Sequence, residues 1–185
     1  MSDRAGAEYE ALRATIRERG SVRLWLILVG LLAWGALALW LWAADGQGAL
    51  TLVPFLAVAA TFEISFFIHT GVERIGRYLQ VYHEEDGQGW EHTVMAYGKN
   101  FPGGGDPLFI RLFSAAAVVN FLSSLAAATR RPGWIVLSLA AHLVLGWRFF
   151  SARQLAATQR TLDLERFTSL KKDGASSPKF SQISN

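Results

Sequence analysis

The chain has 185 residues, enough for one compact domain, and 51% of them are hydrophobic and gathered in long blocks. A helix of about 20 apolar residues crosses the roughly 30 Å core of a bilayer, and no segment has the two-residue alternation of a strand. The formal net charge of +3 is too small to predict nucleic acid as a partner, and the absence of cysteine excludes disulfides and thiolate metal sites. We therefore expect an all-α, polytopic integral membrane protein whose surroundings are the lipid bilayer.

Residues 1–20 are strongly charged and predict a short amphipathic helix on the cytoplasmic face of the membrane. Gly20 and Ser21 favour a break after this helix, with Ser21 as the N-cap of the next one. The first span is predicted at 24–44. It has tryptophans near both ends, which is typical of the aromatic belts at membrane interfaces.

The second span is predicted at 49–68, after a turn that is short enough to make the first two spans a hairpin. It passes without a helix breaker into a polar segment that keeps the helical period. Glu73 and Arg77 in this segment are four residues apart, a spacing at which opposite charges support a helix. We expect an amphipathic extension of the span into the cytoplasm, and we expect the chain to be organised around this long helix.

A long cytoplasmic loop is predicted after this extension, up to residue 107, because glycines 103–105 disfavour a helix. Asp106 and Pro107 then form a helix start signal, an N-cap followed by a first-turn proline. The third span is predicted at 108–128 and the fourth at 134–150. The expected architecture is a four-helix transmembrane bundle with a membrane domain at 21–172.

The helix of the fourth span is expected to continue as a basic segment, and residues 173–185 are predicted to form a disordered, serine-rich tail. Arginine and lysine are concentrated before the first span and in Arg148 to Lys172, so the positive-inside rule predicts that both termini are cytoplasmic. The same basic segment predicts attraction to anionic lipid headgroups. The protein is expected in the cell membrane, and the arginine- and alanine-rich composition favours a bacterial source.

Glu63 is the most informative residue, because a carboxylate inside a span costs a few kcal/mol and implies a partner or a water-filled route. On a helical wheel it shares one side with Arg74 and Arg77. The functional hypothesis is a proton or cation acceptor. The structural alternative is a glutamate that is hydrogen-bonded to polar residues of the other spans. These residues are Asn120, Ser123 and His142.

His142, in the middle of the fourth span, and His69, at the end of the second, are candidate axial ligands of a haem. Their expected depths in the bilayer differ, which speaks against a shared haem. The polar side of the extension also has ligand types that suit a divalent metal, but it lacks two histidines at i and i+4 with a glutamate between them. We therefore predict no metal and no cofactor. The candidate residues of the extension are His69, Glu73, Arg74, Arg77 and His83.

No serine has a histidine and a carboxylate arranged to activate it, so no catalytic residue is predicted and a non-enzymatic role is favoured. The leading hypothesis is a small accessory or scaffold subunit. Its cytoplasmic surface, roughly 69–101, would bind a partner in a membrane complex or form a homo-oligomer. One alternative is an oligomeric proton or cation channel, or a transporter component, that uses Glu63. The other is a haem-binding membrane redox protein.

Overall fold

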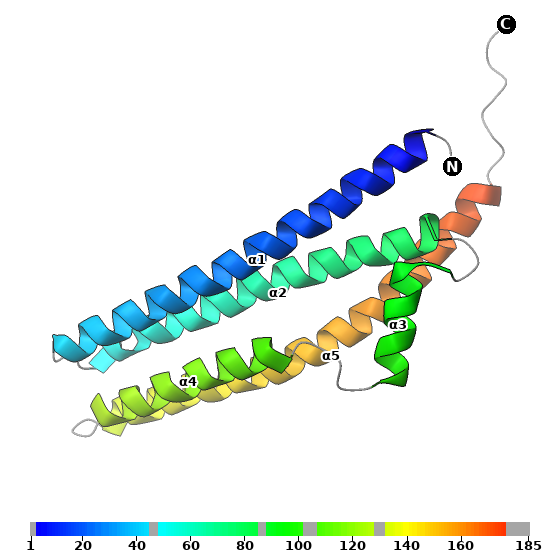
Figure 1. Cartoon of the computed structure of the whole chain (residues 1–185). Coiled ribbons are helices and arrows are strands. Elements are labelled where there is room, and N and C mark those ends of the chain that lie inside the picture. Colours follow the sequence, from blue (N-terminus) through cyan, green and yellow to red (C-terminus); the bar gives the residue numbers. More distant parts are fainter. Residues whose placement is uncertain (1–2, 45–47, 85–87, 102–106, 128–131, 177–185) are drawn as a thin grey trace, which may run out of the picture.

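A computed structural model describes residues 3–44, 48–84, 88–101, 107–127 and 132–176. In this part of the chain the structure is helical and contains no strand, which confirms the predicted all-α class (Figure 1). The elements in chain order are α1 (Asp3–Ala43), the short 3-10 helix η1 (Gly48–Thr51), α2 (Leu52–Tyr82), α3 (Trp90–Asn100), α4 (Pro107–Ala127) and α5 (Pro132–Ser176).

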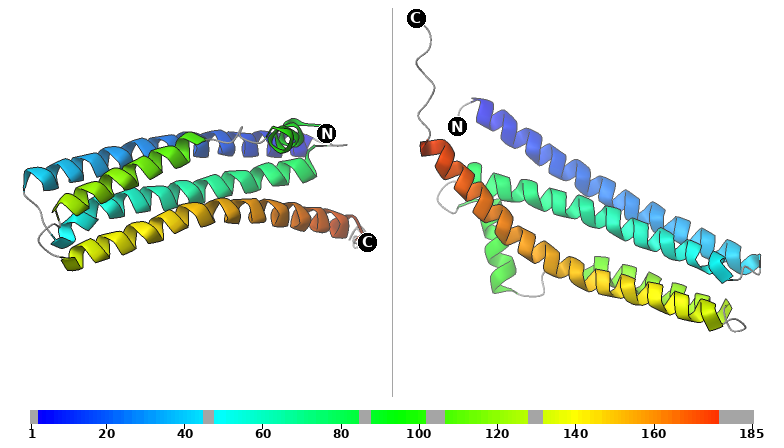
Figure 2. Two further views of the ribbon diagram at one scale, coloured as in Figure 1. Left: turned by 90° about the horizontal axis from the view of Figure 1, so that it is seen from below. Right: turned by 180° about the vertical axis from the view of Figure 1, so that it is seen from behind.

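Four of the described helices, α1, α2, α4 and α5, are long and apolar enough to cross a membrane, which agrees with the number of predicted spans. Their apolar parts lie side by side, and α1, α2 and α5 continue together beyond them (Figures 1 and 2). The apolar half, as we call it, comprises 24–43, 52–68, 109–127 and 132–150. The polar half comprises 3–23, 69–84, 88–101 and 151–176.

The apolar half has the surface that a lipid environment requires. Trp25, Trp40 and Trp42 are all exposed near the two ends of the apolar part of α1. Tryptophan is enriched at both membrane–water interfaces because its ring is apolar and its N–H is polar. The three tryptophans thus occupy the positions of two aromatic belts.

The predicted helix break at Gly20 and Ser21 is wrong, because α1 runs through both residues without interruption. Ser21 Oγ donates a hydrogen bond to the carbonyl oxygen of Arg17 one turn earlier, so it caps no helix start. A glycine inside a helix costs about 1 kcal/mol, a small amount beside the packing of a 41-residue helix against its neighbour.

Two further expectations are corrected. The segment predicted as an irregular loop contains α3, and α5 extends to Ser176, so the first residues of the predicted tail are helical. The start of α4 at Pro107 is confirmed, whereas Asp106, glycines 103–105 and residues 177–185 lie outside the described residues.

The second helix is central, as the sequence pattern predicts, because α2 contacts each of the other described elements. The core between α2, α4 and α5 is apolar and rich in phenylalanine. Its buried members are Val58, Phe62, Phe66, Phe113, Ala116, Leu145, Phe149 and Ala152. Four aromatic rings surround Phe62, with ring centres 4.5 to 6.1 Å away.

Helices α1 and α2 approach each other closely at one glycine. A Cβ atom at Gly30 would overlap the side chain of Thr61, whereas Gly35 on the same helix has open space. Thr61 is buried, and its hydroxyl donates to the carbonyl oxygen of Ala57 at 2.7 Å. The small residue therefore permits a close contact, as small residues do between membrane helices.

Candidate functional site

Glu63 and Arg148 form a bidentate ion pair between α2 and α5, where the apolar half meets the polar half. Arg148 Nε lies 2.7 Å from Glu63 Oε1, and Nη2 lies 2.8 Å from Oε2. The guanidinium carbon is also 5.0 Å from the centre of the Phe66 ring, a cation–π arrangement. Two parallel N–H···O contacts give arginine its strongest geometry with a carboxylate.

The structural alternative for Glu63, a hydrogen bond to another span, is realised with a partner other than the three residues it named. Ser123 donates to a carbonyl oxygen of its own helix, and Asn120 and His142 bond to each other. Arg148, which the sequence assigned to the basic flank, is the partner because α2 and α5 run parallel and bring both residues to one level. Both carboxylate oxygens are paired, so a proton-acceptor role would require this ion pair to open.

A second polar chain crosses the apolar half and joins α1, α4 and α5. Trp34 Nε1 donates to Asn120 Oδ1 at 3.1 Å, and Asn120 Nδ2 lies 3.2 Å from His142 Nε2. His142 Nδ1 lies 2.7 Å from the carbonyl oxygen of Ser138. The carbonyl can only accept, so Nδ1 carries the proton and Nε2 accepts from Asn120.

The haem hypothesis finds little support in this arrangement. Both ring nitrogens of His142 have hydrogen-bond partners, and His69 lies 3.4 Å from Arg23 Nη1 through its own Nδ1. His69 follows Glu63 by six residues and His142 precedes Arg148 by six, in parallel helices. At 1.5 Å per residue, the two histidines are separated by roughly 18 Å along the bundle.

Glu73 is the centre of an ion-pair network in the polar half. Its Oε1 lies 2.7 Å from Arg160 Nη2 on α5, 3.7 Å from Arg77 Nη2 and 3.9 Å from His69 Nε2. The predicted pairing of Glu73 with Arg77 is confirmed. Arg74 lies beside Asp163 of α5 at 3.3 Å, so the side that Glu63, Arg74 and Arg77 share on the wheel divides among different partners.

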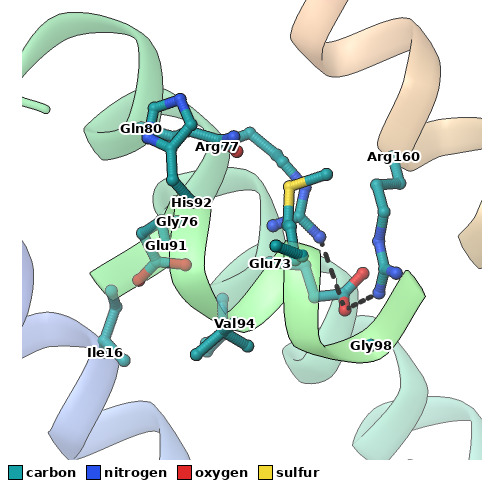
Figure 3. A pocket seen from close by; sticks show the side chains of 13 residues that line it. Ile16, Glu73, Gly76, Arg77, Gln80, Glu91, His92, Val94, Gly98 and Arg160 are labelled. Carbon is teal, nitrogen blue, oxygen red and sulfur yellow. Dashed lines mark hydrogen bonds and ion pairs between the residues drawn. The ribbon is translucent and has the colours of Figure 1, made fainter. Parts of the chain in front are cut away.

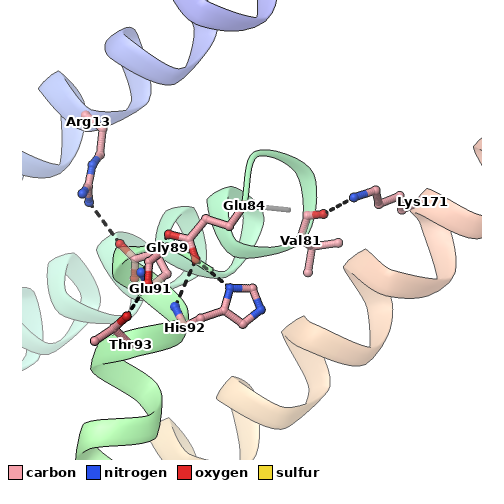
Figure 4. A network of polar contacts seen from close by, with 8 residues as sticks. All are labelled: Arg13, Val81, Glu84, Gly89, Glu91, His92, Thr93 and Lys171. Atoms are coloured by element: carbon pink, nitrogen blue, oxygen red, sulfur yellow. Dashed lines mark hydrogen bonds and ion pairs between the residues drawn. The ribbon is translucent and has the colours of Figure 1, made fainter. Parts of the chain in front are cut away.

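Helix α3 is attached to the polar half through its first turn (Figure 4). The backbone N–H groups of Glu91 and His92 donate to the two carboxylate oxygens of Glu84, at 2.8 and 3.0 Å. His92 Nδ1 also lies 2.7 Å from Glu84 Oε2, and Arg13 of α1 lies 3.1 Å from Glu91. A carboxylate at a helix N-terminus satisfies free N–H groups and complements the helix dipole.

The two glutamates of this attachment have opposite pKa shifts. Burial acts to raise the pKa of Glu84, but the hydrogen bonds from Glu91 and His92 outweigh it, and the pKa is lowered. Burial raises the pKa of Glu91, against the attraction of Arg13. Glu84 is therefore held as a carboxylate, whereas Glu91 gains stability when it binds a proton.

A pocket of about 520 Å³ opens between α1, α2, α3 and α5 in the polar half (Figure 3). Glu73, Arg77 and Gln80 line it from α2, and Arg160 lines it from α5. Arg77 and Gln80 are buried, and Nε of Arg77 and Oε1 of Gln80 have no hydrogen-bond partner among the described residues. The predicted polar side of the extension is thus covered by α3 and α5.

His83 does not line this pocket, and its ring lies tilted against two aromatic rings, with centres 5.7 Å from Tyr9 and 5.9 Å from Tyr78. Its Nε2 is buried and has no hydrogen-bond partner in the described part of the chain. Within the same residues, no three histidine, aspartate or glutamate side chains are grouped so that they could hold a metal ion. The structure therefore separates His83 from His69 and Glu73.

Sequence reasoning missed Gln80 and Arg160 as pocket residues and Glu84 as the cap of α3. One signal was present for α2, because Glu73, Arg77 and Gln80 recur at i, i+4 and i+7 and so share one face. No comparable signal pointed to Arg160, which contacts Glu73 across 87 positions of the sequence.

Comparisons with known proteins found no match for this chain among protein-family models, curated proteins or solved structures. We therefore infer the function from the geometry of the described residues.

Proposed function

We propose that this chain is a membrane-anchored accessory or scaffold subunit that binds a partner protein through α3. One observation carries the proposal: three large aromatic side chains lie exposed on α3 and at the residue that follows it. The exposed fractions are 64% for Trp90, 57% for Tyr97 and 59% for Phe101. Trp90 and Tyr97 are seven residues apart and so lie on one side of the helix, and Phe101 directly follows the helix and lies beside Tyr97. We call these three residues the aromatic stripe.

The aromatic stripe has the composition of a binding hot spot. Tryptophan and tyrosine are enriched at the centres of protein interfaces because they bury a large area at low cost in side-chain entropy. The rings of Tyr97 and Phe101 already contact each other in a tilted arrangement, with centres 4.9 Å apart, so part of the surface is preorganised. The first turn of α3 is held by Glu84 and Arg13, which attaches the helix that carries the stripe to α2 and α1.

The orientation proposed for the chain follows from charge. With basic residues concentrated before the first span and along α5, both termini and the polar half would lie in the cytoplasm of the cell membrane. The basic part of α5 would then lie near anionic headgroups, and the aromatic stripe would face cytoplasmic or membrane-complex partners.

Site-specific photocrosslinking tests the proposal. A p-benzoylphenylalanine introduced at Tyr97 should give an adduct with another protein when membranes are irradiated, because position 97 lies in the stripe. Trp90→Ser in the same chain should abolish this adduct. The matched control carries the crosslinker at Leu170, which is equally exposed on α5 but lies outside the stripe.

The outcomes separate the possible occupants of the stripe. A heterologous protein adduct that requires Trp90 supports the partner-protein proposal. An adduct with the mass of two copies of this chain would replace the partner by self-association and overturn the accessory role. Adducts with lipid alone would make the stripe a membrane-surface contact and would also overturn the proposal.

A further inference from the structure

The ion pair of the apolar half is the most open one in the described part of the chain. The side chains of Glu63 and Arg148 are 45% and 26% exposed. In the other ion pairs between described residues, all of which belong to the polar half, the carboxylate side chains are at most 22% exposed. The carboxylate that lies nearest to hydrocarbon is thus the one that the protein covers least.

The exposed sides of both residues lie among large apolar side chains. On α2, Leu56 and Phe67 are at i−7 and i+4 from Glu63, so they share its face of the helix, and both are strongly exposed. On α5, the exposed Val144 is at i−4 from Arg148. The ion pair therefore opens onto the same surroundings as these apolar side chains, which are the lipids of the bilayer.

The ion pair lies at the depth where lipid headgroups meet the acyl chains. Glu63 precedes the end of the apolar part of α2 by roughly 8 Å, and Arg148 precedes that of α5 by roughly 3 Å, at 1.5 Å per residue. Trp147 is exposed beside Arg148, as tryptophans are at membrane interfaces. The headgroup layer adds about 5–8 Å on each side of the hydrocarbon, so a headgroup that lies low in this layer reaches the pair.

Both charged groups keep hydrogen-bonding capacity after they have paired. A guanidinium has five N–H donors, and Arg148 contacts Glu63 through Nε and Nη2 only. A carboxylate has about four lone-pair sites, and each oxygen of Glu63 has one contact with Arg148. The exposed side of the pair therefore offers N–H donors beside carboxylate acceptors.

The ion pair is electrically neutral, which selects the charge type of its ligand. An anionic headgroup would gain contacts with Arg148 but would lie against the negative charge of Glu63. A headgroup that carries both charges can place its phosphate at Arg148 and its cation at Glu63. A primary ammonium also donates up to three hydrogen bonds to acceptors, whereas a quaternary ammonium has no N–H and donates none.

We propose that the exposed side of the Glu63–Arg148 pair binds a zwitterionic phospholipid with a primary amine, of the phosphatidylethanolamine type. The phosphate accepts hydrogen bonds from Arg148, the ammonium donates to Glu63, and the acyl chains lie along Leu56 and Val144. The site belongs to α2 and α5. It is therefore independent of the aromatic stripe and of partner binding at α3.

Three phospholipids with identical acyl chains test the proposal by changing the headgroup alone. Phosphatidylethanolamine has the phosphate and the ammonium N–H groups, phosphatidylcholine has the same charges without these donors, and phosphatidylglycerol has only the negative charge. The full chain in detergent micelles is titrated with each lipid, and native mass spectrometry measures the bound fraction. Phosphatidylethanolamine is expected to bind roughly tenfold more tightly than the other two, which is the scale of one hydrogen bond between charged groups.

Two variants locate the binding on the ion pair. Glu63→Gln leaves Arg148 without its counter-ion, so the preference for phosphatidylethanolamine should disappear and phosphatidylglycerol should bind more tightly than it does to the unaltered chain. Such a gain cannot result from misfolding. Arg148→Lys keeps the charge with fewer donors and should weaken all three lipids without changing their order. The matched control, Arg74→Gln with Asp163→Asn, removes an ion pair between the same two helices in the polar half.

Each result decides the matter. A preference for phosphatidylethanolamine that Glu63→Gln converts into one for phosphatidylglycerol, and that the control keeps, establishes the site. Equal binding of the three lipids to the unaltered chain would mean that apolar contacts alone hold lipid here, and tightest binding of phosphatidylglycerol would mean attraction by the basic part of α5. Either result overturns the proposal. So does a Glu63→Gln chain that keeps the original preference or gains no phosphatidylglycerol, because the lipid then binds elsewhere.

Discussion

The carboxylate of Glu63 and the guanidinium of Arg148 meet through two N–H···O contacts of 2.7 and 2.8 Å at the boundary of the apolar half. The two residues are 85 positions apart and belong to parallel helices. A charge inside a span is costly when it is alone, and each of these groups provides the other with its counter-ion. The acid that the sequence marks as exceptional is thus a structural link between α2 and α5.

This pairing predicts strong coupling between the two positions. Arg148→Met keeps an apolar stem against Phe66 but leaves Glu63 without a counter-ion, so it should lower the free energy of unfolding in detergent. The double variant with Glu63→Gln should be more stable than Arg148→Met alone, with a coupling energy of about 1–3 kcal/mol. If the loss of unfolding free energy in the double variant equals the sum of the losses in the two single variants, the ion pair contributes nothing.

The close contact at Gly30 predicts that a larger side chain destabilises the protein at this position and not at other glycines of α1. Gly30→Val should destabilise the packing of α1 on α2 by about 1–3 kcal/mol, because the new side chain overlaps Thr61. Gly35→Val is the matched control, since Gly35 lies on the same helix and a Cβ there would meet open space. Unfolding in sodium dodecyl sulfate measures both variants, and similar losses in the two would refute the close contact.

The hydrogen bonds that link Trp34, Asn120 and His142 predict a loss of stability when Asn120, the middle residue, is replaced. Asn120→Leu preserves the volume roughly but leaves His142 Nε2 and the Trp34 N–H without partners. Hydrogen bonds between membrane helices contribute about 1 kcal/mol on average, and a loss of this order is expected. Ser123→Ala is the control, because Ser123 bonds only within its own helix. Thermal unfolding in lipid bicelles compares the two variants.

The cap of α3 predicts a pH dependence. The pKa of Glu84 is lowered from its ordinary value of 4.5 by hydrogen bonds that outweigh burial, so its stabilising contribution is present above about pH 4.5. The contribution is lost as the pH falls through the lowered pKa. Glu84→Gln should therefore increase hydrogen exchange in α3 at neutral pH, and the variant should lose less protection on acidification. Exchange rates corrected for intrinsic pH effects test this.

Glu91 predicts a pH dependence of the opposite sign for the stability of the same attachment. Burial raises its pKa above 4.5, so folding favours the protonated form, and stability rises as the pH falls through the raised value. Glu91→Gln should remove this rise while leaving the acid-induced loss at Glu84 in place. A variant with an unchanged pH profile of α3 exchange would contradict the assignment.

Much of the architecture was predictable from the sequence because it depends on local properties. The four apolar segments, the helical period of the extension and the start signal at Pro107 each arise within about 20 residues. The same holds for the pairing of Glu73 with Arg77 within one helical turn. The break predicted at Gly20 failed because a local cost of about 1 kcal/mol is outweighed by packing along the whole of α1.

The candidate site was not predictable in the same way. Glu84 caps α3 only because the first turn of α3 lies against the end of α2, and the covered face of Arg77 and Gln80 exists only because α3 and α5 lie over it. Hydropathy assigns such residues to a solvated cytoplasmic face. Burial of a polar group is decided by which neighbour is placed against it, and no short stretch of sequence carries that information.

By itself, the sequence determined that this is an all-α chain with four helices long and apolar enough to cross a membrane, and that the second helix is its centre. Only the tertiary structure decided which partner Glu63 has, where α3 attaches, and that a pocket with an unpaired donor and acceptor lies between four helices. The physical reason is the distance along the chain over which each interaction acts. Hydrophobic length and periodicity act within a helix, whereas ion pairs, caps and pockets depend on the relative level of helices that are distant in the chain.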